Sequence, residues 1–371
     1  MRSEVLGATL PDRWSRVGRE RVGDERAMCT LVVLHRCIAG RPLVVAANRD
    51  EFYHRPAEGV ALRSSGTGRI LSPLDLEAGG TWVGLSQAGV FAGLTNLRPL
   101  GTPRADSGAE RGRVQPGVAD SSPSPDLKSR GSVVMQALEA DSAMRAVESL
   151  SKLEEAAYNP FQLLVADGRD AFLIVYRDRV RTIELEPGAH VVGNVEDDRI
   201  AAAIGTADAL TSSGDTGLRE LTEAYPGFEG VEDLIDTAEP RARKLTRIRE
   251  RVEKMVTNPG IDLFEGLARI CREHVDQIGV TSPENVDIRK VDTERVGEGE
   301  IELGEAEGDK QSPFEATCVH IADRYGTRSS LLLELCEDQE RNRLWTTDGP
   351  PCERPFENRS SLLRDLGVRL N

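Results

Sequence analysis

Short apolar runs separated by turn residues dominate the first part of the chain and are typical of β-strands. Two such runs, 30–36 and 43–47, flank Ala39–Gly40–Arg41–Pro42. Glycine and proline at that place mark a turn, so the pattern predicts a hairpin with both strands buried. The second strand continues into Asn48–Arg49–Asp50–Glu51. Charged side chains at the end of a buried strand are costly unless paired, so we expect this tetrapeptide to line a site; a polar strand end that meets water is the alternative.

Further strands are predicted at several places, and two of them end at an asparagine. A short strand or turn is expected over 69–75, and two strands joined by Ser86–Gln87–Ala88–Gly89 end at Asn96. Four more are predicted at 161–165, 171–176, 180–185 and 190–194, the last ending at Asn194. The glycines at 79, 80, 84, 89 and 93 allow tight turns and close backbone approach. Strands that carry polar residues at their ends can build a site at the edge of a sheet.

Helical spacing of apolar residues predicts helices over 133–138, 142–152, 238–256 and 262–274, with Asp262 as an N-cap. A second hairpin is expected from 314–324 and 329–336, turning at Tyr325–Gly326–Thr327–Arg328, with a third strand at 343–347. The tail from Pro355 is expected to pack loosely.

The remaining stretches lack periodicity. Residues 1–27 are polar and Arg-rich, and we expect them to be disordered or to reflect an upstream start codon. Gly, Pro, Ser and Asp at 101–128, and acidic and Gly-rich sequence at 281–313, predict a long surface loop and a flexible insertion. The expected organisation is one domain over 28–350, followed by a tail at 351–371.

Charge narrows the range of partners. The net charge is −15, and only six of the 47 basic residues are lysines. Such an acidic, lysine-poor chain suits a soluble protein in high salt, or reflects a GC-rich genome; it argues against a nucleic-acid partner, which needs a basic surface. No apolar run approaches the ~20 residues of a membrane span, and no signal peptide is evident. A cytoplasmic location is therefore expected.

Six scattered cysteines without a C-x-x-C pair argue against a zinc site and a disulfide framework. No metal is predicted. One cysteine differs from the rest because Cys29 directly follows Met28 at the start of a strand. If translation starts at Met28 and this residue is removed, Cys29 carries a thiol and a free α-amine, which together form a nucleophile and its base. The alternative is an ordinary buried cysteine.

Seven short motifs occur in one order from Met28 to about 333: M-C-T-L-V, N-R-D-E, A-G-G-T-W after Asp75, G-V-F-A-G-L-T-N, S-R-G, Y-N-P-F and Y-G-T-R-S-S. Together they resemble the NRDE family, which includes the animal transport and Golgi organisation protein 2. That family is distantly similar to N-terminal-nucleophile hydrolases of the bile-salt hydrolase and penicillin V acylase type. The resemblance implies an α+β fold, a four-layer αββα sandwich of two mainly antiparallel sheets.

The resemblance also implies site residues, carried over by matching motifs. Cys29 matches the nucleophile, Asp50 the acid that orients its α-amine, and Arg328 an arginine near the thiol. Asn96 and Asn194 match the two oxyanion donors. One departure stands out: the hydrolases have an arginine three residues before the aspartate, where this chain has Ala47. Arg49 can serve instead, since residues two apart share a face of a strand; the alternative is an incomplete catalytic set.

The expected function is hydrolysis of a linear amide or (thio)ester of a small acyl compound, with no cofactor. Asn48, Trp82 and Phe91 are candidate substrate-binding residues, although core packing is the alternative for Trp82 and Phe91. A non-catalytic protein that carries haem or an acyl-CoA in the same cleft is the rival function. The histidines at 35, 54, 190 and 320 show no diagnostic arrangement for haem, and His274 is expected at the surface near the end of a helix.

Overall fold

The computed structural model describes residues 28–97, 127–194, 240–258, 260, 262–274, 315–321 and 325–370. The expectations for 1–27 and 281–313, and nearly all of that for 101–128, lie outside the described residues.

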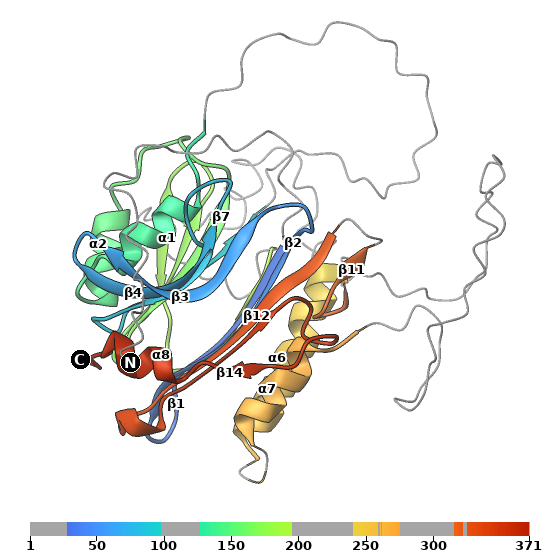
Figure 1. Cartoon of the computed structure of the whole chain (residues 1–371). Helices are drawn as coiled ribbons and strands as arrows, with labels where there is room; N and C mark the ends of the chain where they lie inside the picture. The colour runs from blue at the N-terminus through green and yellow to red at the C-terminus, as the bar shows by residue number, and fades with distance from the viewer. Residues whose placement is uncertain are drawn as a thin grey trace, which may run out of the picture.

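The first sheet is built on the predicted N-terminal hairpin. Strand β1 (Met28–Ile38) pairs antiparallel with β2 (Arg41–Phe52), which in turn pairs with β12 (Tyr325–Leu335). The strand order is β10-β1-β2-β12-β13-β14, with β11 paired to β12. The remaining bounds are β10 (Gly188–Val192), β11 (His320–Ile321), β13 (Arg343–Asp348) and β14 (Glu357–Asn358). Strands from later in the sequence thus flank the hairpin, with β10 beside β1 and β12 beside β2, the latter pair seen in Figure 1.

The second sheet follows chain order, β3-β4-β5-β6-β7-β8-β9, and every neighbouring pair is antiparallel. Its strands are β3 (Ala57–Ser65), β4 (Gly68–Asp75), β5 (Val83–Ser86), β6 (Phe91–Asn96), β7 (Phe161–Ala166), β8 (Ala171–Tyr176) and β9 (Val180–Glu184). Strand β3 was not predicted, because only one of its residues is fully buried and its apolar pattern is weak.

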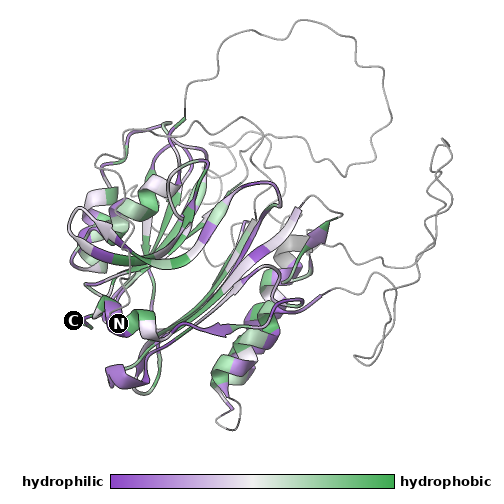
Figure 2. Ribbon diagram, viewed as in Figure 1, coloured by the Kyte–Doolittle hydropathy of each residue, from purple (hydrophilic) through white to green (hydrophobic). Residues whose placement is uncertain are grey.

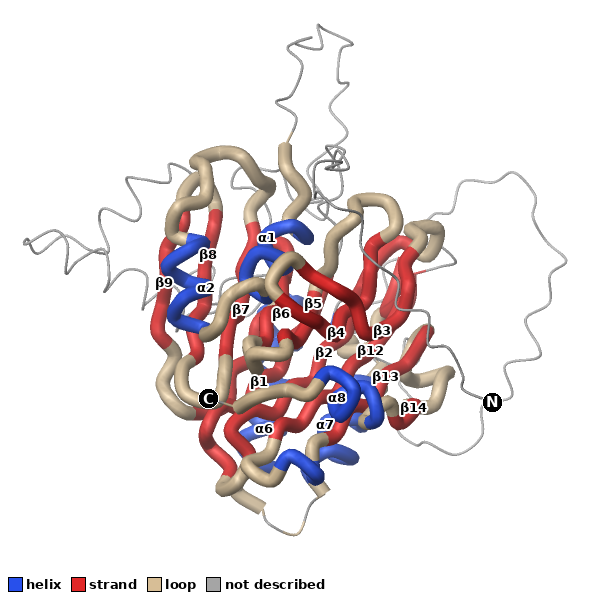
Figure 3. Tube along the Cα trace, turned by 60° about the vertical axis from the view of Figure 1, so that its left-hand side comes forward, coloured by secondary structure: helices blue, strands red, loops and turns tan. Residues whose placement is uncertain are grey.

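Helices cover the outer face of each sheet. Helices α1 (Gly131–Leu138) and α2 (Ala143–Leu150) pack on the second sheet through one apolar core, and α6 (Pro240–Val256) and α7 (Leu263–Cys271) pack on the first through another. A third core fills the space between the sheets. Figure 2 shows apolar residues on the strands and on the packed helices, and Figure 3 shows α1 and α2 on one face of the second sheet. Helix α1 contacts β5 and β6, and α2 contacts β7 and β8. The predicted four-layer αββα sandwich is confirmed.

Alternation along β2 divides its residues between two layers. Val45 and Ala47 point into the core between the sheets, whereas Val44 and Ala46 point toward α6 and α7. Because side chains alternate along a strand, Arg49 follows Ala47 and Asp50 follows Ala46. The tetrapeptide 48–51 therefore serves both faces of the sheet rather than lining one site, which corrects the sequence prediction.

Two expectations for the C-terminal part are wrong. Tyr325–Arg328 does not form a turn: these residues open β12, and the ladder with β2 shifts register between Thr327 and Ser329. The tail is not loosely packed, because helix α8 (Ser361–Leu366) buries Leu363 and Leu366 in the core between the sheets. A short 3-10 turn, η3 (Gln339–Arg341), connects β12 to β13.

Glycines allow two close contacts near the candidate nucleophile, one between the sheets and one between a loop and a helix. A Cβ atom on Gly93 would lie 2.9 Å from Leu31 Cδ1, so glycine on β6 leaves room for the Leu31 side chain of β1 in its present position. A Cβ atom on Gly80 would lie 2.6 Å from the carbonyl carbon of Gly131. The glycines of A-G-G-T-W and S-R-G therefore hold the loop after β4 against the start of α1.

Candidate functional site

A cleft lies where the start of β1, the ends of β2, β4 and β6, and the beginning of α1 meet. Its volume is about 70 Å³, enough for the reacting group of a substrate. The residues that line it are Cys29, Arg49, Glu51, Arg55, Asp75, Ala78, Gly80, Thr81, Trp82, Leu94, Asn96, Ser129, Arg130 and Gly131. The structure thus brings together four of the predicted site residues, Cys29, Arg49, Trp82 and Asn96.

Cys29 opens β1 and faces this cleft. Only 6% of the residue is exposed. Burial, followed by the charge of Asp50, raises the pKa of the Cys29 thiol to about 12, although Arg49 acts in the opposite direction. While Met28 is attached, the thiol is therefore protonated at neutral pH and a weak nucleophile.

Asp50 lies opposite Met28 in the β1–β2 ladder and is fully buried. Its Oδ1 accepts a hydrogen bond of 2.6 Å from the Thr327 hydroxyl, while Oδ2 has no hydrogen-bond partner among the described residues. Burial raises the pKa of Asp50 to about 6, against the influence of Lys244 and of the Thr327 hydroxyl. A buried carboxylate oxygen without a donor is costly, so this position is suited to receive one.

Lys244 was missed by the sequence analysis, which assigned the charges of its helix to solvent. It lies in α6, is 2% exposed, and its charge favours the ionised form of Asp50. The sequence did contain one indication that Lys244 is buried. It lies beside the apolar face of a helix, in a chain with very few lysines.

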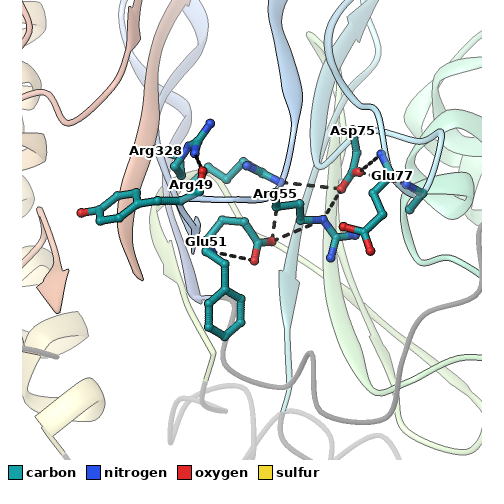
Figure 4. Close-up of polar contacts among 9 residues, drawn as sticks. Arg49, Glu51, Arg55, Asp75, Glu77 and Arg328 are labelled. Carbon is teal, nitrogen blue, oxygen red and sulfur yellow. Dashed lines mark hydrogen bonds and ion pairs between the residues drawn. The ribbon is translucent and has the colours of Figure 1, made fainter. Parts of the chain in front are cut away.

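Ion pairs from β2, from the residues after it and from β4 build one wall of the cleft (Figure 4). Arg49 lies 3.5 Å from Glu51 and 3.6 Å from Asp75, while Arg55 bonds Asp75 at 2.8 Å. Asp75 also accepts the backbone N–H groups of Glu77 and Ala78 through Oδ1. Arg49 lies on the cleft side that Ala47 would share, as the two-residue spacing predicted, and its position is fixed by two carboxylates.

The two predicted asparagines are neighbours, but only one faces the cleft. Asn96 ends β6 and lines the cleft, and its backbone carbonyl accepts a 2.9 Å bond from Asn194 Nδ2. Gly193 is held in turn by Thr95 Oγ1 at 2.7 Å and by Gln162 Nε2 at 2.9 Å. Asn194 therefore holds the end of β6 in place and is not one of the residues that line the cleft.

Three other candidate residues lie elsewhere. Asn48 is buried on the helix side, where Nδ2 donates to the carbonyls of Cys271 and Thr317. Arg328 sits at the irregularity in β12 and donates to the Tyr53 carbonyl, outside the cleft lining (Figure 4). Phe91 is 1% exposed in the core between the sheets. The positive charge that acts on the Cys29 thiol comes from Arg49.

Several residues of the cleft were not singled out from the sequence, namely Arg55, Asp75, Thr81, Ser129 and Arg130. Most of these residues belong to the seven motifs or lie next to them. That position was the one indication in the sequence that they line a site. Trp82 and Ser129 have a side-chain polar atom, Nε1 and Oγ, with no hydrogen-bond partner in the described parts of the chain. The cleft thus offers polar groups that a ligand can engage.

Fold and site together define a class: four-layer αββα proteins with a cysteine at the start of a central strand and an asparagine-bearing strand end across the cleft. The chain belongs to the Transport and Golgi organisation 2 family, whose sequence profile matches residues 28–344. The family predicted from the seven motifs is therefore confirmed.

Curated relatives include the transport and Golgi organization protein 2 homologues of cattle and humans. They are 34% and 33% identical to this chain over 165 residues, a match that covers 41% of this chain and 50% of each relative. The match spans about half the length of these relatives.

Solved structures with lower similarity include a conjugated bile acid hydrolase of Clostridium perfringens and a penicillin V acylase of Agrobacterium tumefaciens. The first is 8% identical, with 90% of this chain and 93% of that chain covered and a TM-score of 0.42. The second is 13% identical, with 86% and 83% covered and a TM-score of 0.38. Similarity at this level assigns neither activity nor substrate.

Within the described residues, no helix is both long and apolar enough to cross a membrane.

Proposed function

We propose that this protein is an N-terminal cysteine hydrolase that acts on a linear amide or (thio)ester of a small acyl compound. The observation that carries the proposal is the buried Oδ2 of Asp50, which has no hydrogen-bond partner among the described residues and lies beside the residue that precedes Cys29. When Met28 and all residues before it are removed, the new α-amine of Cys29 begins the strand opposite Asp50. An ammonium group there would supply the missing donor and a compensating charge.

The same change activates the nucleophile. A positive charge on the residue that carries the thiol favours the thiolate, and the pKa of Cys29 falls from about 12 toward the ordinary range. The unprocessed chain is therefore an inactive form. Processing supplies both the base and the charge.

In the proposed reaction the Cys29 sulfur attacks the substrate carbonyl, and the thiol proton passes to the α-amine. The side-chain amide of Asn96 stabilises the oxyanion, a contribution of about 3–4 kcal/mol for one donor. The α-amine then protonates the leaving amine, alcohol or thiol. Water attacks the remaining thioester, gives one proton back to the sulfur through the α-amine, and releases the carboxylic acid.

The test compares two forms of the chain, one that begins at Cys29 after cleavage by a specific protease and one that retains Met28. Mass spectrometry confirms each N-terminus, and both are screened against acyl amides and thioesters for release of amine or thiol. We expect turnover only in the form that begins at Cys29, and its loss in Cys29→Ala. Cys37→Ala, at the other end of β1, is the matched control and should retain activity. Equal turnover in Cys29→Ala would refute the proposal.

A carrier role remains a second candidate for one reason: with Met28 attached, the high pKa of Cys29 leaves a polar cleft that can bind without reacting. Cys29 is the one cleft-lining residue within the described ranges whose side chain commonly ligates haem iron, so haem would have to bind through it. A haem or acyl chain would also extend beyond the cleft volume. Haem titration of Cys29→Ala against the parent chain distinguishes the functions: a Soret shift that needs Cys29, without acyl turnover, favours the carrier.

A further inference from the structure

Four cysteine and histidine side chains form a group outside the cleft, toward the helix-covered face of the first sheet. They are His274, Cys318, His320 and Cys352, and their ligand atoms all lie within 4.8 Å of one another. Cys318 is buried, His320 and Cys352 are half-buried, and His274 is exposed. Nothing in the proposed hydrolysis uses them.

The distances within this group match those around a tetrahedral zinc ion. Zinc bonds of about 2.3 Å to sulfur and 2.0–2.1 Å to nitrogen place tetrahedral ligand atoms about 3.8 Å apart for two sulfurs and about 3.6 Å for sulfur and nitrogen. Here the two sulfurs are 3.5 Å apart, and His320 Nε2 lies 3.5 Å from Cys318 Sγ and 3.3 Å from Cys352 Sγ. A small outward movement of each atom accommodates the ion.

The backbone holds these segments together independently of any ion. His274 follows the end of α7, and the preceding residue, Glu273, accepts the N–H groups of Thr317 and Cys318 at 3.1 and 2.9 Å through its carbonyl. Asn48 ties Thr317 to the first sheet. The ligand pocket is thus pre-organised.

The fourth ligand, Cys352, lies in the turn between β13 and β14. The ligands therefore come from three distant parts of the sequence, with only Cys318 and His320 close together. This is why ligand spacing along the chain predicted no zinc site.

We propose that His274, Cys318, His320 and Cys352 bind one zinc ion as a structural site. Two thiolates and two imidazoles are a donor set that suits zinc better than the oxygen-preferring magnesium or calcium. Two thiolate charges balance the ion, and the two thiol protons are released on binding. All four positions are taken by protein, which leaves none open for a catalytic water.

The site joins the end of α7, β11 and the turn before β14 into one unit on the sheet. The N–H of Val319, between two ligands, donates to Thr327 Oγ1 at 2.9 Å, and this hydroxyl donates to Asp50. The ion thereby braces the wall behind Asp50. Closure of long stretches of chain by one ion is expected to stabilise the folded state.

The test is elemental analysis of the full chain produced with zinc, with removal of loosely bound metal. We expect one zinc ion per chain in the parent protein and in Cys37→Ala, and none in Cys352→Ala. His274→Ala removes an exposed ligand and should fold; it should weaken zinc binding by more than the roughly 10- to 100-fold typical of residues that only support a ligand. Cobalt substitution should give the visible bands and the thiolate charge-transfer band of a tetrahedral site.

A chelator provides a second readout. It should lower the thermal midpoint of the parent protein and leave that of Cys352→Ala unchanged.

Three results would overturn the proposal. One is a reduced, folded parent chain that takes up neither zinc nor cobalt. Another is a Cys318–Cys352 disulfide, seen as a mass lower by two hydrogens, in a protein that binds no metal after reduction. Retention of full affinity in both Cys352→Ala and His274→Ala would likewise place the ion elsewhere.

Discussion

Removal of every residue before Cys29 should raise the reactivity of its thiol. With Met28 attached, the pKa of Cys29 is raised from 9.0 to about 12, chiefly by burial and secondly by Asp50. Below both values, each pKa unit reduces the thiolate fraction tenfold. A return to the ordinary pKa therefore gives about a thousandfold more thiolate at neutral pH.

The gain in rate is smaller than the gain in thiolate. A less basic thiolate is a poorer nucleophile, with a Brønsted slope of about 0.4–0.5 in disulfide exchange. Three pKa units therefore accelerate the reaction by about 30- to 60-fold. That factor is large enough to measure with a small neutral disulfide reagent such as dithiodipyridine.

The measurement follows thiopyridone release against pH for the two forms and assigns the modified cysteine by peptide mass mapping. Cys336 is a reference within the same chain, because burial also raises the pKa of its thiol and it follows the far end of the β12–β2 ladder, away from Asp50 and the cleavage point. A change in pKa moves the inflection of the pH–rate profile, whereas a change in accessibility alters only its plateau.

Two variants test the sign of the electrostatic effects on the form that retains Met28. Arg49 lowers the pKa of Cys29 and Glu51 raises it, so Arg49→Met should slow the exchange and Glu51→Gln should accelerate it. Identical pH–rate profiles for the processed and unprocessed forms would refute the reasoning.

Three further predictions concern buried residues. Because the pKa of Asp50 is raised from 3.8 to about 6, its contribution to stability is fully present below pH 3.8 and is lost as pH rises through 6. The unfolding free energy of wild type relative to Asp50→Asn should therefore fall by about 3 kcal/mol between pH 3 and 8 in urea titrations, and a constant difference would contradict this. Asn48→Ala leaves the Cys271 and Thr317 carbonyls without their side-chain donor, so urea denaturation should show a loss of about 2–4 kcal/mol. Asn358→Ala, which removes one exposed hydrogen bond from the Ser360 N–H, should cost much less. Leu366→Ala in α8 should cost about 2–5 kcal/mol, whereas Leu76→Ala, 50% exposed, should cost little; equal thermal midpoints would show that the tail contributes no core.

Much of the candidate site was predictable because it depends on local pattern and on motifs. The hairpin that begins at Cys29, the strand that ends at Asn96 and the glycines that allow close packing were all expected, and they meet at one cleft. The place of Arg49 on the cleft side of β2, the side that Ala47 shares, followed from the two-residue period of a strand. Each of these features can be predicted from residues that are close together in the sequence.

Other features required the packing of distant segments. Lys244 and Asp50 are far apart in the sequence. Helix α6 nevertheless brings Lys244 close to Asp50, on the face of β2 that points away from the cleft. Arg328 has a motif match, but an irregularity in β12 turns its side chain to the Tyr53 carbonyl. Helix α8 was not predicted because it has few apolar residues. Their burial depends on the core between the two sheets, which the local sequence does not show.

The sequence by itself determined the strand and helix pattern, the family and the position of Cys29 at the start of a central strand, since these depend on short-range periodicity and motif order. Only the tertiary structure shows that Asn48 and Asp50 lie on the helix-covered face of β2, whereas Arg49 and Glu51 line the cleft. It also brought two cysteines and two histidines from three segments together. The reason is physical: alternation along a strand is local, but what covers each face depends on contacts between residues hundreds of positions apart.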